Sequence, residues 1–226
     1  MSRWPQQLGS KGSQRWLQLV VNRSPELIDD KIKNRLGLSP HDVRWLSPLK
    51  VDEYAEYSDQ AFLDRLDVSL DIFPLSDFWP RWGPHWDGLA KSDNGDLFIV
   101  EAKSHIGELE TSSGAVDKSL AKISCALDMV RGYLRTSGEF DWTRHLYQYA
   151  NRLAHLYLLR TLNHLPAYLV FVYFVNDKQM SGPSSVEEWE GTIGLVNALL
   201  GLKDGHALSK YILDVFIDVS ELEASG

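Results

Sequence analysis

A tight turn near the middle of the chain most constrains how it can fold. Residues 93–96 are Asp-Asn-Gly-Asp, and the Asn-Gly pair tolerates the positive φ angles that hairpin turns require. The segments on either side, 86–92 and 97–105, have the composition of β-strands. The pattern predicts an antiparallel hairpin. The other elements must then pack around a sheet that contains it.

The rest of the chain alternates between helical and strand patterns. Residues 165–175 form a continuous apolar run, which is typical of a central strand buried on both faces. Residues 77–86 hold three tryptophans and two prolines, and we expect a rigid aromatic loop there. Further helices are predicted over 24–36, 52–66, 115–135, 142–163 and 186–200, and further strands over 68–73 and 211–219. This order predicts a mixed α/β (α+β) fold, in which helices flank a mixed central sheet.

We expect one domain that follows a loose, polar N-terminal tail. The tail covers residues 1–23, and the domain covers residues 24–226. Within that domain the core is predicted over about 51–175, and a helix and a strand extend it over 176–226.

Composition excludes several classes of protein. The chain of 226 residues has a single cysteine, Cys125, which excludes an internal disulfide framework and a zinc site built from cysteines. Its longest apolar runs fall short of the roughly 18–20 residues that a membrane-spanning helix needs. Residues 1–12 lack the apolar core of a signal peptide. We therefore expect a cytoplasmic protein with no membrane partner.

The net charge of −8 argues at first against a general nucleic-acid binder. The charge is unevenly distributed, however. Residues 51–114 hold four basic and fourteen acidic side chains, whereas residues 1–50 hold nine basic and four acidic ones. Basic residues are again in excess over 115–165. Either a metal site lies beside a phosphate-binding surface, or the charges mix in space without functional meaning.

Two charged residues lie on one face of the second hairpin strand. Because side chains alternate along a strand, Glu101 and Lys103 point to one side while Val100 and Ala102 point to the other. Charges on an otherwise apolar strand are costly to bury unless they have partners. We therefore expect these two residues to belong to a cluster of interacting charges.

The length of the turn decides whether Asp87 joins this cluster. A three-residue loop over 93–95 places Asp87 opposite Glu101, with Cβ atoms about 5 Å apart. A two-residue loop would turn Asp87 to the other face of the hairpin. The functional interpretation requires the three-residue loop.

Two carboxylates at that distance repel each other unless one is protonated or both bind a cation. Hard oxygen ligands favour Mg²⁺ or Mn²⁺, which keep several waters and accept phosphate oxygens. Lys103 beside them can orient an attacking water and stabilise negative charge in a phosphoryl transition state. The three residues together indicate phosphoryl-transfer chemistry.

Asp87, a turn and then Glu101-Ala102-Lys103 on an apolar strand resemble the PD-(D/E)XK nuclease superfamily, which has the restriction-endonuclease-like fold. The resemblance implies that Asp87 and Glu101 bind Mg²⁺ or Mn²⁺ and that Lys103 assists the nucleophilic water. Trp86 stands where the family's name-giving proline would be, although Pro84 lies two residues earlier. Many family members lack that proline.

The helix predicted over 142–163 supplies supporting candidates. His145, Gln148, Arg152 and His155 lie three or four residues apart and therefore share one helix face. Several branches of the family place a glutamine near the metal on a helix after this strand, and Gln148 resembles it. The alternative is that the stripe is the solvated face of an amphipathic helix.

Other candidates come from neighbouring helices. Ser119 and Lys122, on the helix predicted over 115–135, are candidates for phosphate contacts. The family also often supplies an acidic residue from its first helix, and Asp59 and Glu56 are the two candidates for that position.

Two functions are compatible with these residues. The first is a metal-dependent nuclease that hydrolyses DNA, with RNA as the alternative substrate. The second is a nuclease-like fold with weak or no activity that serves as a nucleic-acid or protein binding module. Trp79, Trp82 and Trp86 precede Asp87 and either stack on bases or fill the core. The sequence indicates no self-complementary surface, so we predict no particular oligomeric state.

Overall fold

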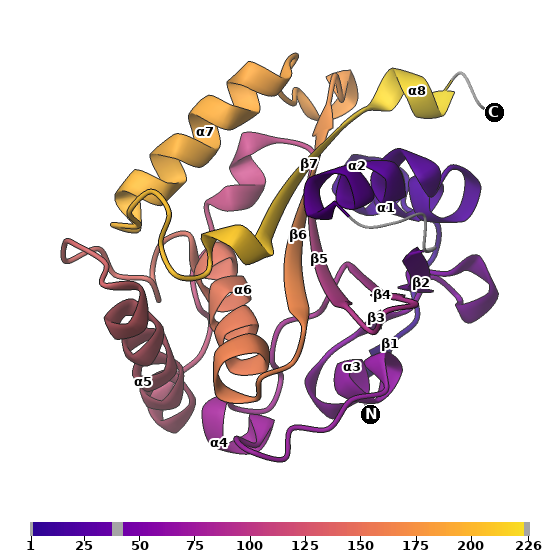
Figure 1. Ribbon diagram of the computed structural model, residues 1–226. Helices are drawn as coiled ribbons and strands as arrows, with labels where there is room; N and C mark the ends of the chain where they lie inside the picture. The colour runs from indigo at the N-terminus through magenta and orange to yellow at the C-terminus, as the bar shows by residue number, and fades with distance from the viewer. Residues whose placement is uncertain (1, 38–42, 224–226) are drawn as a thin grey trace.

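The computed structural model describes residues 2–37 and 43–223. Within these ranges a five-stranded sheet lies between two layers of helices (Figure 1). In spatial order its strands are β2 (Val43–Ser47), β4 (Gly88–Ser92), β5 (Leu97–Lys103), β6 (Ala167–Val175) and β7 (Ile212–Asp218). β4 is antiparallel to both of its neighbours, whereas β5, β6 and β7 run parallel. The predicted mixed α/β class is therefore confirmed.

Helices cover both faces of this sheet (Figure 1). One face is covered by α1 (Gly12–Arg23) and α2 (Glu26–Leu36), with the short α8 (Val219–Glu223) beyond the end of β7. The other face is covered by α5 (Asp117–Leu134), α6 (Tyr147–Tyr157) and α7 (Val186–Leu199). A π-helical turn over Leu158–Leu162 continues α6. No helix in these ranges is both long enough and apolar enough to pass through a membrane.

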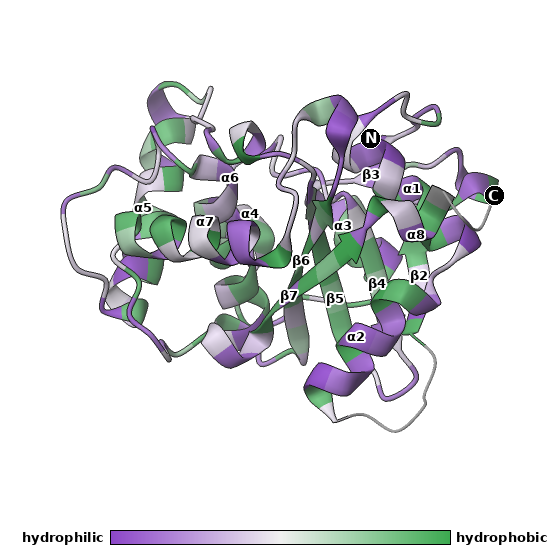
Figure 2. Cartoon of the chain, turned by 90° about the horizontal axis from the view of Figure 1, so that it is seen from above, coloured by the Kyte–Doolittle hydropathy of each residue, from purple (hydrophilic) through white to green (hydrophobic). Residues whose placement is uncertain are grey.

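The two faces of β5 enter two separate hydrophobic cores. The side toward α1 and α2 consists of Phe98, Val100 and Ala102. On the α6 side, Leu97 and Ile99 are apolar, and Glu101 and Lys103 continue the same row. Because both faces are covered, the central strands are mostly hydrophobic (Figure 2). Two charged side chains therefore lie in a layer that is otherwise apolar.

The N-terminal segment is folded, so the predicted loose tail over 1–23 is wrong. Residues 12–23 form α1, whose Trp16, Leu17 and Val20 are buried against the sheet. Before it, β1 (Arg3–Trp4) pairs with β3 (Glu56–Tyr57) in a small second sheet. The glycines and polar residues at the start of the chain concealed this amphipathic helix from the sequence analysis.

The helix predicted over 52–66 is shorter, and the strand predicted over 68–73 is absent. The helix here is α3 (Asp59–Leu66); Glu53 and Tyr54 before it have left-handed φ angles of 52° and 49°, which a helix cannot accommodate. In the 68–73 segment, the Asn163 side chain accepts the Phe73 N–H (3.0 Å) and replaces a strand partner. The short α4 (Leu75–Phe78) overlaps the start of the predicted aromatic loop.

Candidate active site

The β4–β5 hairpin has the three-residue loop that the functional interpretation requires. Gly88 pairs with Val100, and the register is unbroken to the turn at residues 93–95. Asp87 stands one residue before β4 and therefore lies across from Glu101. Its Oδ2 atom accepts the Ala102 N–H at 2.8 Å, which fixes the carboxyl group against β5. The predicted register is confirmed.

Glu101 is the centre of a buried ion-pair network. Its Oε1 atom lies 2.5 Å from Lys103 Nζ, and its Oε2 atom accepts the Arg152 Nε–H at 2.6 Å. Lys103 Nζ also donates to Gln148 Oε1 at 2.9 Å. Glu101 is 1% exposed and Arg152 2% exposed, so these charges are paired out of contact with water.

Arg152 is held by more than Glu101. Its other nitrogens donate to the Asn151 side chain at 2.9 Å and to the His85 carbonyl oxygen at 2.7 Å. Its guanidinium group lies 4.6 Å from the centre of the Trp86 ring, a cation–π contact. The aromatic loop before β4 and helix α6 are therefore joined through this one side chain.

Of the four-residue stripe predicted on this helix, two members reach the network. Gln148 and Arg152 lie one turn apart on α6 and contact Lys103 and Glu101. His145 lies before α6 and packs against the Phe140 ring. His155 is buried among the rings of Phe62, Phe78, Trp79 and Trp86. Burial lowers the pKa of His155 to about 3, so it packs there as a neutral side chain.

The two acidic groups have opposite electrostatic environments. Burial of the Asp87 carboxyl group, together with the neighbouring charge of Glu101, raises its pKa well above the ordinary value. Burial would also raise the pKa of Glu101, but the charges of Arg152 and Lys103 outweigh it and lower that pKa. Glu101 is therefore ionised, whereas no cation forms an ion pair with Asp87 in the part of the chain that the structure describes.

A cavity of about 440 Å³ opens beside Asp87. It is lined by Glu56, Pro84, His85, Asp87, Thr111, Ser112, Tyr147, Gln148, Asn151 and Arg152. The cavity therefore brings a loop, a short strand and one face of α6 to the same space. Its walls carry both acidic and basic groups, a combination suited to a charged ligand with a bound cation.

The structure separates the two acidic candidates near the first helix. Glu56 lies on β3 and lines the cavity, and its charge also raises the pKa of Asp87. Asp59 instead accepts the N–H groups of Trp82 (3.2 Å) and Gly83 (2.9 Å). Glu56 is thus the acid placed to act with Asp87, and Asp59 holds the aromatic loop.

Ser119 and Lys122 are not part of this cavity. Both lie on α5, and Lys122 Nζ donates to the Ser76 carbonyl oxygen near α4. Neither residue is among those that line the space beside Asp87. The geometry gives no support to the predicted phosphate contacts of these two residues.

The donor set fits a divalent cation bound through few protein ligands. In the described parts of the chain, no group of three or more His, Cys, Asp or Glu side chains converges on one point. Mg²⁺, however, commonly binds through one or two carboxylates and keeps its waters. The raised pKa of Asp87 is the property expected of a carboxyl group whose charge a cation would offset.

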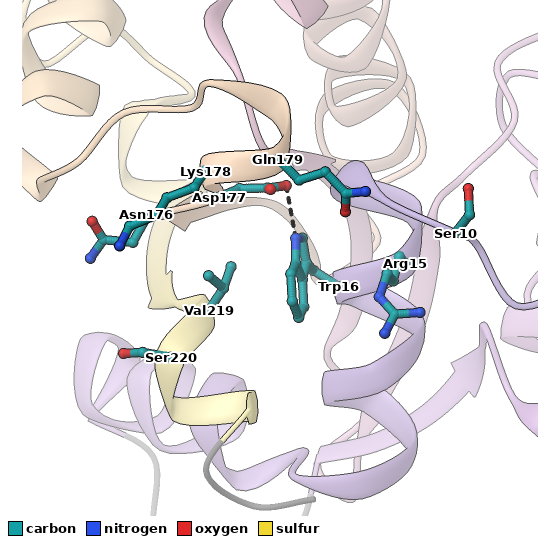
Figure 3. A pocket seen from close by; sticks show the side chains of 9 residues that line it. All are labelled: Ser10, Arg15, Trp16, Asn176, Asp177, Lys178, Gln179, Val219 and Ser220. Atoms are coloured by element: carbon teal, nitrogen blue, oxygen red, sulfur yellow. Dashed lines mark hydrogen bonds between the residues drawn. The ribbon is translucent and has the colours of Figure 1, made fainter.

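A larger cavity, of about 580 Å³, lies between α1 and the ends of β6 and β7 (Figure 3). Asp177 is buried at its wall and accepts the Trp16 Nε1–H at 2.8 Å. Arg15 and Lys178 also line it. None of the residues singled out by the sequence analysis is found there.

Several residues of the smaller cavity escaped the sequence analysis. Tyr147 and Asn151 flank Gln148 on α6, and the helical period alone could have found them. His85 gave no such signal, because a loop without periodicity does not reveal where its side chains and carbonyl oxygens point.

Comparisons of the chain with protein-family models, curated proteins and solved structures give no match. The functional assignment therefore depends on the geometry and chemistry of the cavity beside Asp87.

Proposed function

We propose that this protein is a divalent-metal-dependent nuclease of the PD-(D/E)XK type that hydrolyses DNA phosphodiester bonds. The observation that carries the proposal is the placement of Asp87 across the hairpin from Glu101, with Lys103 in contact with Glu101. Asp87 lines an open cavity, and Glu101 and Lys103 are buried next to two other lining residues, Arg152 and Gln148. This arrangement meets the requirement for paired carboxylates and a cationic side chain at one reaction centre.

In this proposal Asp87 and Glu101 would hold Mg²⁺ or Mn²⁺. The bound ion would lower the pKa of a water molecule bound to it and would partly balance the negative charge of the phosphate. Arg152 keeps Glu101 ionised, since its guanidinium group lowers the pKa of that carboxyl group. Glu56 adds a third negative charge at the cavity wall.

In this proposal Lys103 assists the nucleophile. Glu101 and Gln148 hold its Nζ atom at 2.5 and 2.9 Å, which leaves one of its three N–H donors for a water or a phosphate oxygen. In the reaction the water oxygen bonds to phosphorus, and the bond from phosphorus to the leaving sugar oxygen breaks. The proton lost by the water is balanced by one gained at the leaving oxygen.

The test is cleavage of plasmid and single-stranded DNA with Mg²⁺ or Mn²⁺. We expect Asp87→Asn and Lys103→Ala to lower the cleavage rate by about 10²–10³-fold, because each removes a group that acts at the reacting phosphate. Lys178→Ala is the matched control, since this lysine lines the other cavity. Equal cleavage by the wild type and all variants would identify a contaminating nuclease and refute the proposal.

One observation favours the second candidate function, a binding module with a nuclease-like fold. Both carboxylate oxygens of Glu101 are already occupied, one by Lys103 and the other by Arg152. A carboxylate paired with two cations attracts a metal ion less strongly, because both cations repel the ion. Calorimetric titration with Mn²⁺ separates the two functions: a folded protein that binds no metal is the binding module.

A further inference from the structure

One large aromatic side chain is exposed next to the candidate active site. Of the three tryptophans in the loop, Trp79 and Trp86 are buried, whereas Trp82 is 74% exposed. Its ring lies 6.1 Å from the ring of Trp4, which in turn stacks on His85 at 4.8 Å. The three rings form a continuous aromatic patch made of Trp4, Trp82 and His85.

The backbone that holds this patch in place is conformationally strained at Trp82. Trp82 has a φ angle of 66°, a left-handed conformation that is unfavourable for a bulky residue. The carboxylate of Asp59 fixes it by accepting the N–H groups of Trp82 and Gly83. Trp4 is fixed by the hydrogen bond from its Nε1–H to Ser58 Oγ at 3.2 Å. An exposed tryptophan on a strained, anchored loop is better explained by binding than by packing.

The patch is continuous with the cavity. His85 belongs to both, and its carbonyl oxygen accepts a hydrogen bond from Arg152. Trp4 pairs across the small sheet with Glu56, which also lines the cavity. A ligand that lies on the rings therefore reaches the space beside Asp87 without leaving the protein surface.

The charge beside Trp82 suits a polyanion. Arg81 is exposed and lines a pocket together with Trp82 and Asp59, and it forms no ion pair with an acidic side chain in the part of the chain that the structure describes. The nearby Asp59 carboxylate is occupied by backbone N–H groups. A free cation beside an exposed aromatic face is the combination that binds the phosphates and bases of a single strand.

We infer that the Trp4–Trp82–His85 patch binds unstacked bases of single-stranded DNA and leads the strand to the cavity. This inference rests on the proposed function and adds its substrate class. In a duplex each base already stacks on its neighbours, so the patch can take bases only from a single strand or a frayed end. Arg81 then contacts the backbone beside the stacked base, and the phosphodiester farther along the strand lies next to Asp87.

The experiment measures binding separately from cleavage. Fluorescence anisotropy follows a labelled oligothymidylate of about 20 nucleotides, and a duplex of equal length, in the presence of EDTA. We expect Trp82→Ala to weaken single-strand binding by roughly 5- to 100-fold, because stacking on one ring is lost. Trp82→Phe should keep most of the affinity. Tyr133→Ala, which removes a half-exposed aromatic ring on α5, is the matched control and should change nothing.

Two results would overturn the inference. One is single-strand binding by Trp82→Ala that equals the wild type, and the other is an equal loss of duplex binding. If the protein binds single strands through Trp82 but does not cleave DNA with metal, the proposed hydrolysis is refuted. The inference about the aromatic patch is then unaffected. Cleavage that persists with binding independent of Trp82 would refute the patch alone.

Discussion

Each of the two cavities described above has a buried carboxylate in its wall or next to it, but the two carboxylates are stabilised in different ways. In the cavity between α1 and the ends of β6 and β7, Asp177 accepts hydrogen bonds from two neutral donors, Trp16 Nε1 (2.8 Å) and Met180 N (3.3 Å). No cation pairs with it in residues 2–37 and 43–223. Next to the cavity beside Asp87, Glu101 is bound by two cations, one of which, Arg152, lines the cavity, and a second acid stands across the hairpin.

This difference separates a structural role from a chemical one. The hydrogen bonds of Asp177 join α1 to the segment after β6 and leave no opposing charges to rearrange. The smaller cavity holds acids and bases whose protonation depends on one another, which is the arrangement found where chemistry is performed. Volume alone would favour the larger cavity, whereas the electrostatics favours the cavity beside Asp87 as the candidate site.

Replacing the buried carboxylate by an amide should lower the free energy of unfolding by different amounts at the two positions. Glu101→Gln should cause the larger loss. An amide in place of this carboxylate leaves Lys103 and Arg152 buried without a counter-charge. We expect the free energy of unfolding to fall by about 3–5 kcal/mol, as measured by urea denaturation in EDTA.

Asp177→Asn should cost less, about 1–2 kcal/mol. The amide keeps one acceptor oxygen, so the Trp16 Nε1–H loses its partner or the Met180 N–H keeps only its 3.1 Å bond to the Asp177 carbonyl oxygen, but no buried charge is left alone. The same denaturation experiment measures it. If the two variants lose equal stability, the distinction drawn between the cavities is wrong.

The smallest effect should come from Asp87→Asn, and its sign should be the opposite. The folded protein raises the pKa of Asp87, so this carboxyl group contributes stability below its unfolded pKa and loses that contribution as the pH rises. In EDTA, Asp87→Asn should therefore be more stable than the wild type at about pH 7.5, and this advantage should vanish near pH 4. Denaturation at both pH values measures the difference, and a difference independent of pH would contradict the electrostatic account.

The sequence predicts the elements whose signals are local. The turn at residues 93–95 and the alternation along β5 together place Asp87 opposite Glu101, because a strand fixes side chains by a period of two. The continuous apolar run of β6 is likewise predicted correctly. Residues with a helical period, such as Gln148 and Arg152, are predicted to share a face, and they do.

What the sequence does not reveal depends on contacts between distant segments. α1 was missed because its apolar face follows a polar start, and β3 was missed because its partner β1 lies about 50 residues earlier in the chain. The same limit applies to His85, whose carbonyl oxygen binds Arg152, and to the exposure of Trp82 among three neighbouring tryptophans. Neither can be deduced without the packing of the loop against α6 and β1.

The long connection between β5 and β6 also sets the order in which the site is assembled during folding. Asp87 and the Ala102 N–H are 15 residues apart, whereas Arg152 is 51 residues from Glu101. Closing the longer loop costs more conformational entropy, and parallel strand pairing is slow. The hairpin can form before α6 arrives, and during that interval its two carboxylates face each other without Arg152. Docking of α6 therefore adds Arg152 to Lys103 as the second cation that pairs with Glu101.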